Sequence, residues 1–392
     1  MTGQSSSGPL AGIQIIELAG LGPVPFAGMV LSDLGADVIR IERPGGSKDT
    51  PSSRPERDPL LRGRRSLVLD LKSPGGIDVL LRLVDGADGL MEGLRPGVAE
   101  RLGIGPEDCL ARSPAMVYAR MTGWGQDGPL AHAAGHDINY IALTGALGVI
   151  GRAGTPPVAP PSLVGDFGGG GMLLVVGMLA ALLESRASGQ GQVVDAAMVD
   201  GSALLTTLLY GLRANGVWRD ERGVNFADSG APFYEVYETA DGRYVTVGAL
   251  EPQFYAELRS LAGLVGPEWD DQADDAAWPE LKIKLAAVFR QRTRDQWCAL
   301  LEGTDACFAP VLTLEEAPVH PHNVARGTFI DLDNVVQPAP APRFSRTPAA
   351  VDHPPRVPGT DTSEVLLGAG FKDEEIAELL AAGVVWEPKH DN

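Results

Sequence analysis

Three segments combine acid–base side chains with glycine, and they are the places where this chain could carry out proton transfer. The first is GHDINY, in which His136 and Asp137 are adjacent, and the second is VGDFGGGG, in which Asp166 precedes a glycine run. The third is VGALEPQFY, where Glu251 stands between a short apolar run and a helical pattern. Histidine and carboxylic acids are the side chains that most often exchange protons with a substrate near neutral pH.

Each of these segments also has a purely structural interpretation. Asp137 and Asp166 stand where helices are expected to begin, and an aspartate there commonly caps free backbone N–H groups. The glycine run either permits close packing or leaves backbone N–H groups uncovered as an oxyanion site, for which Gly168 and Gly169 are the candidates. Glu251 fits equally well as a first-turn carboxylate favoured by the helix dipole. Spacing alone does not bring the three segments together.

Short apolar runs alternate with helical patterns around the first two segments. GIQIIEL, PFAGMVLSDLGA and DVIRIER read as strand, helix and strand, and SLVLDL, GIDVLLRLVDGA, GLMEGL and AMVYARMTG continue the alternation. Strands separated by helices of about a dozen residues predict βαβ units and a parallel sheet. The expected fold class is therefore α/β, with a Rossmann-like parallel-sheet large domain. Residues 172–188 form the most apolar helical pattern, which we expect to be buried.

A change of pattern near residue 230 predicts a smaller α+β domain. APFYEVYETADGRYVTVGAL alternates with period two around Asp241-Gly242, which is a strong hairpin signal. The expected organisation is 1–200 as the N-terminal part of the large domain, 201–235 as a helical linker, 236–328 as the small domain, and 329–392 as a Pro-rich strap and C-terminal helix that returns to the large domain.

The charge balance limits the class of partner. A formal net charge of −19 makes the surface repel polyanions, which argues against nucleic-acid binding. An anionic ligand must then meet local positive charge, and Arg40, Arg43, Arg62, Arg64 and Arg65 supply it in VIRIERPGG and LLRGRRSLVLDL. Taken alone, these arginines fit a solvated basic face equally well.

Signals for export, membrane insertion and structural metal are not seen in the sequence. MTGQSSSGPLAGIQIIEL has no basic segment followed by an apolar one, and no uninterrupted apolar run reaches about 18 residues. We therefore expect no membrane insertion and a cytoplasmic location. Cys109, Cys298 and Cys307 are an odd number without CxxC spacing, which argues against a disulfide framework and a zinc site.

Several motifs read together resemble the α-methylacyl-CoA racemases of the family III CoA-transferase superfamily over nearly the whole chain. GHDINY and GALEPQFY are typical of the racemase branch, whereas the opening PLAGIQIIELAGLGPVPFAGMVLSDLGADVIRIERPG is shared with the transferases. Further matching segments include RGRRSLVLDLK, YARMTGWGQDGP, GQGQVVDAAMVDG and TDACFAPVLTLEEA. Ser229 departs from the glycine usual in the family, and Gly165 and Gly171 vary positions around Asp166.

The resemblance implies that His136 and Asp166 are two bases on opposite faces of the α-carbon of an acyl-CoA thioester, working without a cofactor. It makes Glu251 a carboxylate that orients the histidine and Asp137 a residue near the pantetheine, and both count as candidate catalytic residues. Family dimers interlock, so we expect a homodimer in which Glu251 reaches His136 from the partner chain. The expected CoA-binding residues are Arg43, Arg62, Leu69, Asp70, Leu71, Lys72, Arg95, Gly135 and Tyr140.

Racemisation by two bases places a physical demand on Asp166. Its carboxyl must hold a proton near neutral pH in one half of the reaction, so burial must oppose its ionisation and raise its pKa. Asp166 would instead be a nucleophile in a family III CoA-transferase, although transferases commonly carry GYD or GFD where this chain has GHD. A non-catalytic acyl-CoA-binding protein is a further alternative. A nicotinamide dehydrogenase is disfavoured because LAGLGPVPFAG has prolines where GxGxxG needs glycines.

Overall fold

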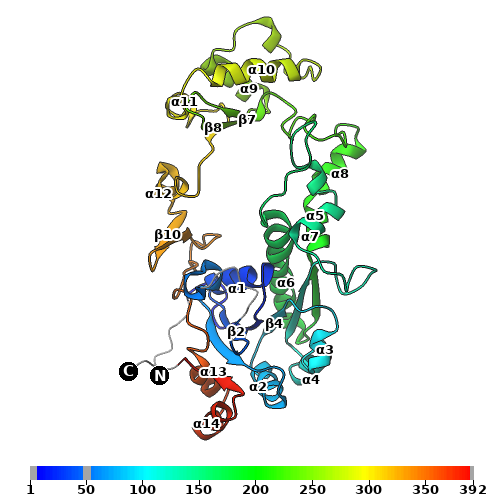
Figure 1. The fold of residues 1–392 in the computed structure, drawn as a ribbon, viewed down its shortest axis with the longest axis vertical. Helices are drawn as coiled ribbons and strands as arrows, with labels where there is room; N and C mark the ends of the chain where they lie inside the picture. Colours follow the sequence, from blue (N-terminus) through cyan, green and yellow to red (C-terminus); the bar gives the residue numbers. More distant parts are fainter. Residues whose placement is uncertain (1–6, 47–53, 389–392) are drawn as a thin grey trace. The chain divides into compact units, whose positions relative to one another are not determined.

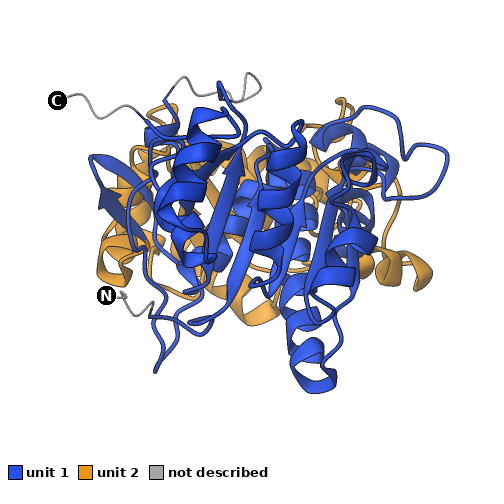
Figure 2. Ribbon diagram, turned by 90° about the horizontal axis from the view of Figure 1, so that it is seen from below, with its two compact units in different colours: residues 1–144, 160–205, 329–392 blue, residues 145–159, 206–328 orange. Residues whose placement is uncertain are grey.

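The computed structural model describes residues 7–46 and 54–388, which form two compact units. Unit 1 comprises residues 1–144, 160–205 and 329–392, and unit 2 comprises residues 145–159 and 206–328 (Figure 2). Segment 201–235, expected as a linker, is divided after Leu205 between the two units. Segment 329–392 belongs to unit 1, which is where the expected strap was predicted to return.

A seven-stranded sheet forms the centre of unit 1 in the described residues. Its strand order is β12-β3-β2-β1-β4-β5-β6, and every pairing is parallel except that of β12 with β3. The parallel α/β sheet predicted from the alternating pattern is confirmed. The strands are β1 (Gln14–Leu18), β2 (Asp37–Glu42), β3 (Arg65–Leu69), β4 (Gly89–Glu92), β5 (Val117–Thr122), β6 (Val193–Ala197) and β12 (Val385–Trp386).

Helices cover both faces of this sheet, which explains why its strands are apolar on both sides. In β1, Ile15 packs with residues of α1 and α6, whereas Ile16 and Leu18 pack with residues of α2, α4 and α13. These helices are labelled in Figure 1. The α-helices of unit 1 are α1 (Pro23–Asp33), α2 (Pro74–Val84), α3 (Val98–Leu102), α4 (Pro106–Arg112), α5 (Asp137–Leu143), α6 (Met172–Ser188), α7 (Met198–Leu205), α13 (Thr362–Gly368) and α14 (Asp373–Ala381).

Shorter helical turns complete unit 1. The wide turn η4 (Leu163–Gly171) is a π-helix that runs directly into α6. The 3₁₀ turns η1 (Pro55–Arg57) and η2 (Pro59–Leu61) precede β3. The C-terminal strap contains the antiparallel pair β10 (Phe329–Leu332) and β11 (Val335–Pro338), and it is tied to the rest of unit 1 by hydrogen bonds such as Gly63 N–H to the His353 carbonyl.

The segment Leu163–Ser188 is long and apolar enough to cross a membrane, with a mean hydropathy of 1.8. Length and composition alone are weak evidence, because the core helix of a soluble protein passes the same test. Leu174, Val175 and Met178 of α6 are buried in the core between α1 and the sheet. Val176 and Leu183 on the other side of α6 are 57% and 74% exposed.

Unit 2 contains the predicted hairpin. Strands β7 (Tyr234–Glu238) and β8 (Tyr244–Gly248) pair antiparallel across the Asp241-Gly242 turn, and Gly242 has a φ of 70° that favours glycine. β9 (Phe308–Pro310) extends the sheet on β8. The helical elements are η3 (Leu147–Val149), α8 (Thr207–Ala214), α9 (Pro252–Ala262), η5 (Pro267–Trp269), α10 (Trp278–Phe289), α11 (Arg294–Leu301), η6 (Ala317–Val319) and α12 (Pro321–Arg326).

Candidate active site

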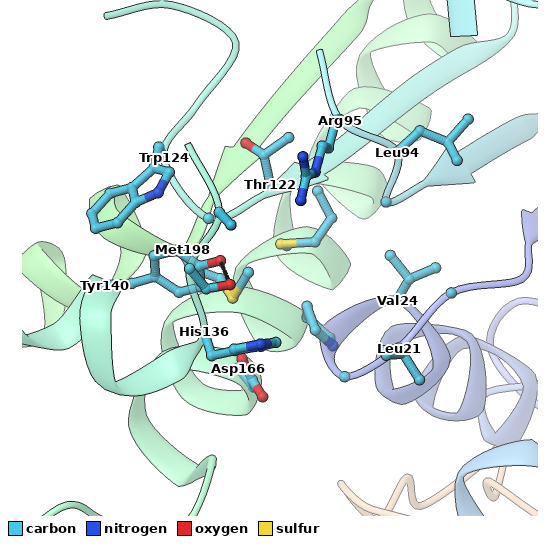
Figure 3. Close-up of a pocket in the computed structure, with 18 of the residues that line it drawn as sticks. Leu21, Val24, Leu94, Arg95, Thr122, Trp124, His136, Tyr140, Asp166 and Met198 are labelled. Carbon is cyan, nitrogen blue, oxygen red and sulfur yellow. Dashed lines mark hydrogen bonds between the residues drawn. The ribbon is translucent and has the colours of Figure 1, made fainter. Parts of the chain in front are cut away.

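A cavity of about 490 Å³ opens at the carboxyl ends of the parallel strands in unit 1 (Figure 3). It lies where the chain leaves β1, β2, β4 and β5, and the strand order reverses direction between β1 and β4. Ligands of open α/β sheets bind in the crevice at such a switch point. The lining residues are Ala19, Gly20, Leu21, Gly22, Pro23, Val24, Arg43, Gly93, Leu94, Arg95, Pro96, Met121, Thr122, Gly123, Trp124, Ala131, Ala133, Ala134, Gly135, His136, Tyr140, Asp166 and Met198.

Backbone hydrogen bonds of His136 fix this residue at the start of α5. Its N–H donates to Asn139 Oδ1 at 3.0 Å, and its carbonyl accepts from the N–H groups of Asn139 and Tyr140. The side chain of Asn139, three residues after His136, thus satisfies the backbone N–H at the start of the helix. The imidazole lies in the cavity beside Asp166 (Figure 3).

Asp166 reaches the same cavity from η4, so the two predicted bases are brought together. Burial raises the pKa of the Asp166 carboxyl, which agrees with the demand that two-base chemistry makes on it. The charge of Asp137 acts in the same direction, whereas a hydrogen bond with Ser162 and the proximity of His136 lower the pKa. The surroundings therefore favour a neutral carboxyl more than water does.

The carboxylate of Asp137 binds the backbone of η4. Asp137 is 7% exposed, and its Oδ2 accepts the backbone N–H groups of Gly165 at 2.7 Å and Asp166 at 2.8 Å. Asp137 is not among the lining residues. The sequence interpretation that Asp137 caps α5 is wrong, because its side chain instead binds the backbone of η4.

The glycine run that follows Asp166 packs against α7. A Cβ placed on Gly201 of α7 would stand 1.8 Å from the carbonyl oxygen of Gly169, and one on Gly169 would stand 2.6 Å from the Ser202 nitrogen. Neither Gly168 nor Gly169 lines the cavity. Gly169 therefore allows η4 and α7 to approach closely, and the assignment of Gly168 and Gly169 as oxyanion donors stays a prediction.

Tyr140 and Gly135 form one wall of the cavity. The Tyr140 hydroxyl donates to the carbonyl of Gly135, and a Cβ on Gly123 would lie 2.1 Å from the phenol ring. Trp124 meets this ring edge-on, with centroids 4.8 Å apart. Burial raises the pKa of the Tyr140 phenol, and the nearby Asp166 carboxylate adds to the effect. Tyr140 is thus a neutral packing group that fixes the loop before His136.

Two of the predicted CoA-binding arginines line the cavity and one does not. Arg43, after β2, and Arg95, after β4, are exposed there. Arg62 is 2% exposed and is bound to Asp33, to Gln337 Oε1 at 2.8 Å and to the Pro338 carbonyl. The assignment of Arg62 to CoA is therefore wrong, because this guanidinium is buried and each of its three nitrogens donates to a protein atom, which leaves it unable to meet a phosphate.

The other basic side chains of the same segment are also paired. Arg64 is 2% exposed and contacts Glu17, and Arg65 donates to both carboxylate oxygens of Asp37. Leu69, Asp70, Leu71 and Lys72 lie where β3 ends, at the same edge of the sheet as the cavity but outside its lining. Leu69 is buried, whereas Lys72 is exposed.

Glu251 lies in unit 2, at the residue that precedes α9, and its side chain is exposed. All the residues that line the cavity belong to unit 1, so the proposed contact between Glu251 and His136 stays a prediction. Within residues 7–46 and 54–388, no cluster of three or more His, Cys, Asp or Glu side chains could hold a metal ion.

Several wall residues were not singled out from the sequence. Leu21, Val24, Met121, Trp124 and Met198 give the cavity its apolar lining. Most of them follow or end a strand that the sequence pattern predicts, so the rule that ligands bind at the carboxyl ends of parallel strands could have found them.

Comparisons with known proteins agree with the resemblance read from the motifs. The model of CoA-transferase family III matches residues 10–362. The chain is 47% identical to the α-methylacyl-CoA racemase of Mus musculus, covering 97% of this chain and 98% of the relative, and 47% identical to that of Homo sapiens, covering 94% and 96%.

More distant relatives include transferases. The chain is 28% identical to the succinyl-CoA:glutarate CoA-transferase of Homo sapiens, over 96% of this chain and 90% of that protein. The crystal structure of a CAIB/BAIF family protein from Brucella suis superposes with a TM-score of 0.82 at 25% identity, over 93% of this chain and all of that one. The chain belongs to CoA-transferase family III.

Proposed function

We propose that this protein racemises 2-methylacyl-CoA thioesters at the α-carbon. The observation that carries the proposal is the presence of His136 and Asp166 in one cavity, within a chain that is 47% identical over nearly its full length to proteins named as α-methylacyl-CoA racemases. Inversion requires a base that removes the α-proton and an acid that returns one to the other face, and an imidazole and a carboxyl can exchange these roles.

One proton is shared by the pair in both directions of the reaction. When neutral His136 removes the α-proton, a protonated Asp166 donates to the opposite face of the enolate. When the Asp166 carboxylate removes it, the His136 imidazolium donates. Burial of Asp166 supports the first half, since the raised pKa of its carboxyl keeps the neutral form accessible. No electrons change hands, so the reaction needs no redox cofactor.

Arg43 and Arg95 are proposed to bind the anionic CoA part of the substrate. Both side chains are exposed on the cavity lining, and guanidinium groups match phosphate oxygens with paired donors. The wall of Leu21, Val24, Met121 and Met198 offers apolar contact to the remainder of the thioester. Leu69 to Lys72 lie further along the same sheet edge and extend this proposed surface.

A homodimer is part of the proposal. Unit 1 exposes apolar side chains on α6, on the edge strand β6 and on α7, of which Leu183 is 74% and Leu204 64% exposed. Apolar surface of this kind is typical of protein–protein contacts. In the dimer we place Glu251 of the partner subunit beside His136, where a carboxylate would orient the imidazole.

The test is racemisation by His136→Ala and Asp166→Ala. We expect each variant to lose conversion of a single enantiomer of 2-methylacyl-CoA while it still binds the acyl-CoA, measured by calorimetry. Retention of most racemase activity by either variant would refute the assignment. The alternative CoA-transferase, with Asp166 as nucleophile, predicts CoA exchange between two acyl groups and trapping of an acyl-enzyme by hydroxylamine during turnover.

A further inference from the structure

The carboxylate of Asp137 joins the two segments that carry His136 and Asp166. One oxygen, Oδ2, accepts the backbone N–H groups of both Gly165 and Asp166, at 2.7 and 2.8 Å. Asp137 is also the first residue of α5 and directly follows His136. Both donors lie 28 and 29 residues away in the sequence, so these two bonds fix the start of η4 against the start of α5.

The space beside this carboxylate is too small for any residue larger than glycine at position 165. A Cβ placed on Gly165 would stand 2.5 Å from Asp137 Oδ2 and 3.1 Å from the Ile141 side chain. Glycine at this position therefore lets the η4 backbone reach the carboxylate. Hydrogen bonds to a charged acceptor are stronger than neutral ones, and leaving these N–H groups, one buried and one partly buried, without a partner costs free energy.

We propose that Asp137 is a positioning residue for proton transfer: it holds the backbone of Asp166 at a set place relative to His136 and does so without touching the substrate. The inference rests on the proposed racemisation and assigns Asp137 a role behind the reacting pair. Asp137 is buried and does not line the cavity, unlike His136 and Asp166.

The charge of Asp137 has a second effect on the same partner. It raises the pKa of Asp166 in addition to the larger effect of burial. Besides His136, the cationic side chains of the cavity that holds Asp166 are the exposed Arg43 and Arg95. α5 presents His136, Asp137 and the buried phenol of Tyr140, and Ser162 donates a hydrogen bond. The other elements packed against η4 add little charge. Gly22 before α1 contributes backbone, α7 contributes Met198 and Ser202, and the first turn of α6 is uncharged. The remaining carboxylates are Asp200 of α7, which is exposed, and Asp195 of β6, which accepts the Gln126 N–H.

Two substitutions separate the positional effect from the effect of charge. In Asp137→Asn the amide oxygen can still accept both N–H groups, but the negative charge is gone. In Asp137→Ala both the acceptor and the charge are lost. Asp200→Asn on α7 is the matched control, because it removes an exposed aspartate that is outside the cavity lining.

The kinetic readout is kcat and KM for racemisation across pH. For Asp137→Ala we expect kcat to fall by about 100-fold, the cost of a displaced catalytic group, with KM nearly unchanged. For Asp137→Asn we expect most of the kcat at the optimum to return and the acid limb of the pH profile to move to lower pH, because the Asp166 carboxyl ionises more easily. Asp200→Asn should match the unsubstituted protein.

A second readout does not depend on turnover. The protein is labelled with ¹³C at its aspartate carboxyls, and the Asp166 signal is identified by its absence in Asp166→Asn. Its titration should move to lower pH in Asp137→Asn and stay unchanged in Asp200→Asn. This measurement tests the effect of the Asp137 charge on Asp166 whether or not Asp137→Ala folds.

Two results would overturn the inference. A raised KM with unchanged kcat and pH profile in Asp137→Ala would show that Asp137 contacts the substrate, and unchanged kcat and KM in that variant would show that its two hydrogen bonds do not position Asp166. An unmoved Asp166 titration in Asp137→Asn would overturn the effect of the Asp137 charge on Asp166. These outcomes are separate from failure of the proposed function, which would appear as racemisation by His136→Ala or Asp166→Ala whatever the Asp137 variants do.

Discussion

Removal of the Arg62 side chain should destabilise unit 1 and leave the affinity for acyl-CoA unchanged. The guanidinium donates to Asp33 from Nε at 3.1 Å and from Nη2 at 2.5 Å, and from Nη1 to Gln337 Oε1 and the Pro338 carbonyl, both at 2.8 Å. The side chains of Arg62 and Asp33 are 2% and 4% exposed. Arg62 thus connects α1 to the C-terminal strap in the interior of unit 1.

The size of the effect follows from what Arg62→Ala leaves behind. Burial raises the pKa of Asp33, and the hydrogen bonds and charge of Arg62 oppose that rise. Without Arg62 the carboxylate is unpaired in a buried site, and breaking a buried ion pair in this way costs about 3–5 kcal/mol. At about 2–4 °C per kcal/mol for a domain of this size, Tm should fall by roughly 6–20 °C.

The assay pairs thermal unfolding with substrate kinetics below the lowered Tm. Arg43→Ala serves as the opposite case, because Arg43 is exposed on the cavity lining: its KM should rise far more than its kcat falls, with little change in Tm. The double variant Arg62→Met with Asp33→Leu should recover much of the stability, since apolar side chains can replace a buried pair. If Arg62→Ala keeps its Tm and raises KM, Arg62 binds CoA and the reasoning is refuted.

Two further perturbations test packing and buried charge. Gly201→Ala should destabilise the protein by about 1–3 kcal/mol in urea unfolding, because its Cβ would stand 1.8 Å from the Gly169 carbonyl oxygen. Gly211→Ala is the control: a Cβ there meets nothing within 4 Å, so this variant should be neutral or slightly stabilising. Equal effects of the two substitutions would contradict the packing role of the glycine run. Burial raises the pKa of Glu92, despite its contact with Arg120, from 4.5 to about 7, so the folded state holds this proton more tightly than the unfolded state. The contribution of Glu92 to stability is therefore present below pH 4.5 and lost as pH rises to about 7. Glu92→Gln should remove this part of the pH dependence of the unfolding free energy. If the slope of unfolding free energy against pH is the same in both proteins, Glu92 is already ionised in the folded state.

Local pattern was sufficient to predict the sheet and the hairpin. Apolar runs at β1 to β5 and the Asp241-Gly242 turn report on backbone preferences that act over a few residues, and the structure has strands at these places. The resemblance to a family supplied the pairing of His136 with Asp166, which no spacing could give. The structure adds that both residues line one cavity.

Roles that depend on distant partners were not visible in the sequence. Arg62 reads as a surface cation because Asp33 and Gln337, which pair with it, are 29 and 275 residues away. Asp137 reads as a helix cap because Gly165 becomes its neighbour only after folding. The close packing of Gly169 against α7 is likewise invisible in the sequence, because Gly201 and Ser202 of α7 become its neighbours only after folding.

The most direct test of the two-base account is exchange of the α-proton with solvent in single-base variants. Each pure enantiomer of a 2-methylacyl-CoA is incubated in deuterated water with His136→Ala or Asp166→Ala, and deuterium at the α-carbon is followed by mass spectrometry. The account predicts that each variant exchanges one enantiomer without inverting it, and that the two variants select opposite enantiomers. Exchange of the same enantiomer by both variants, or continued interconversion by either, would contradict the claim that His136 and Asp166 act on opposite faces of one carbon.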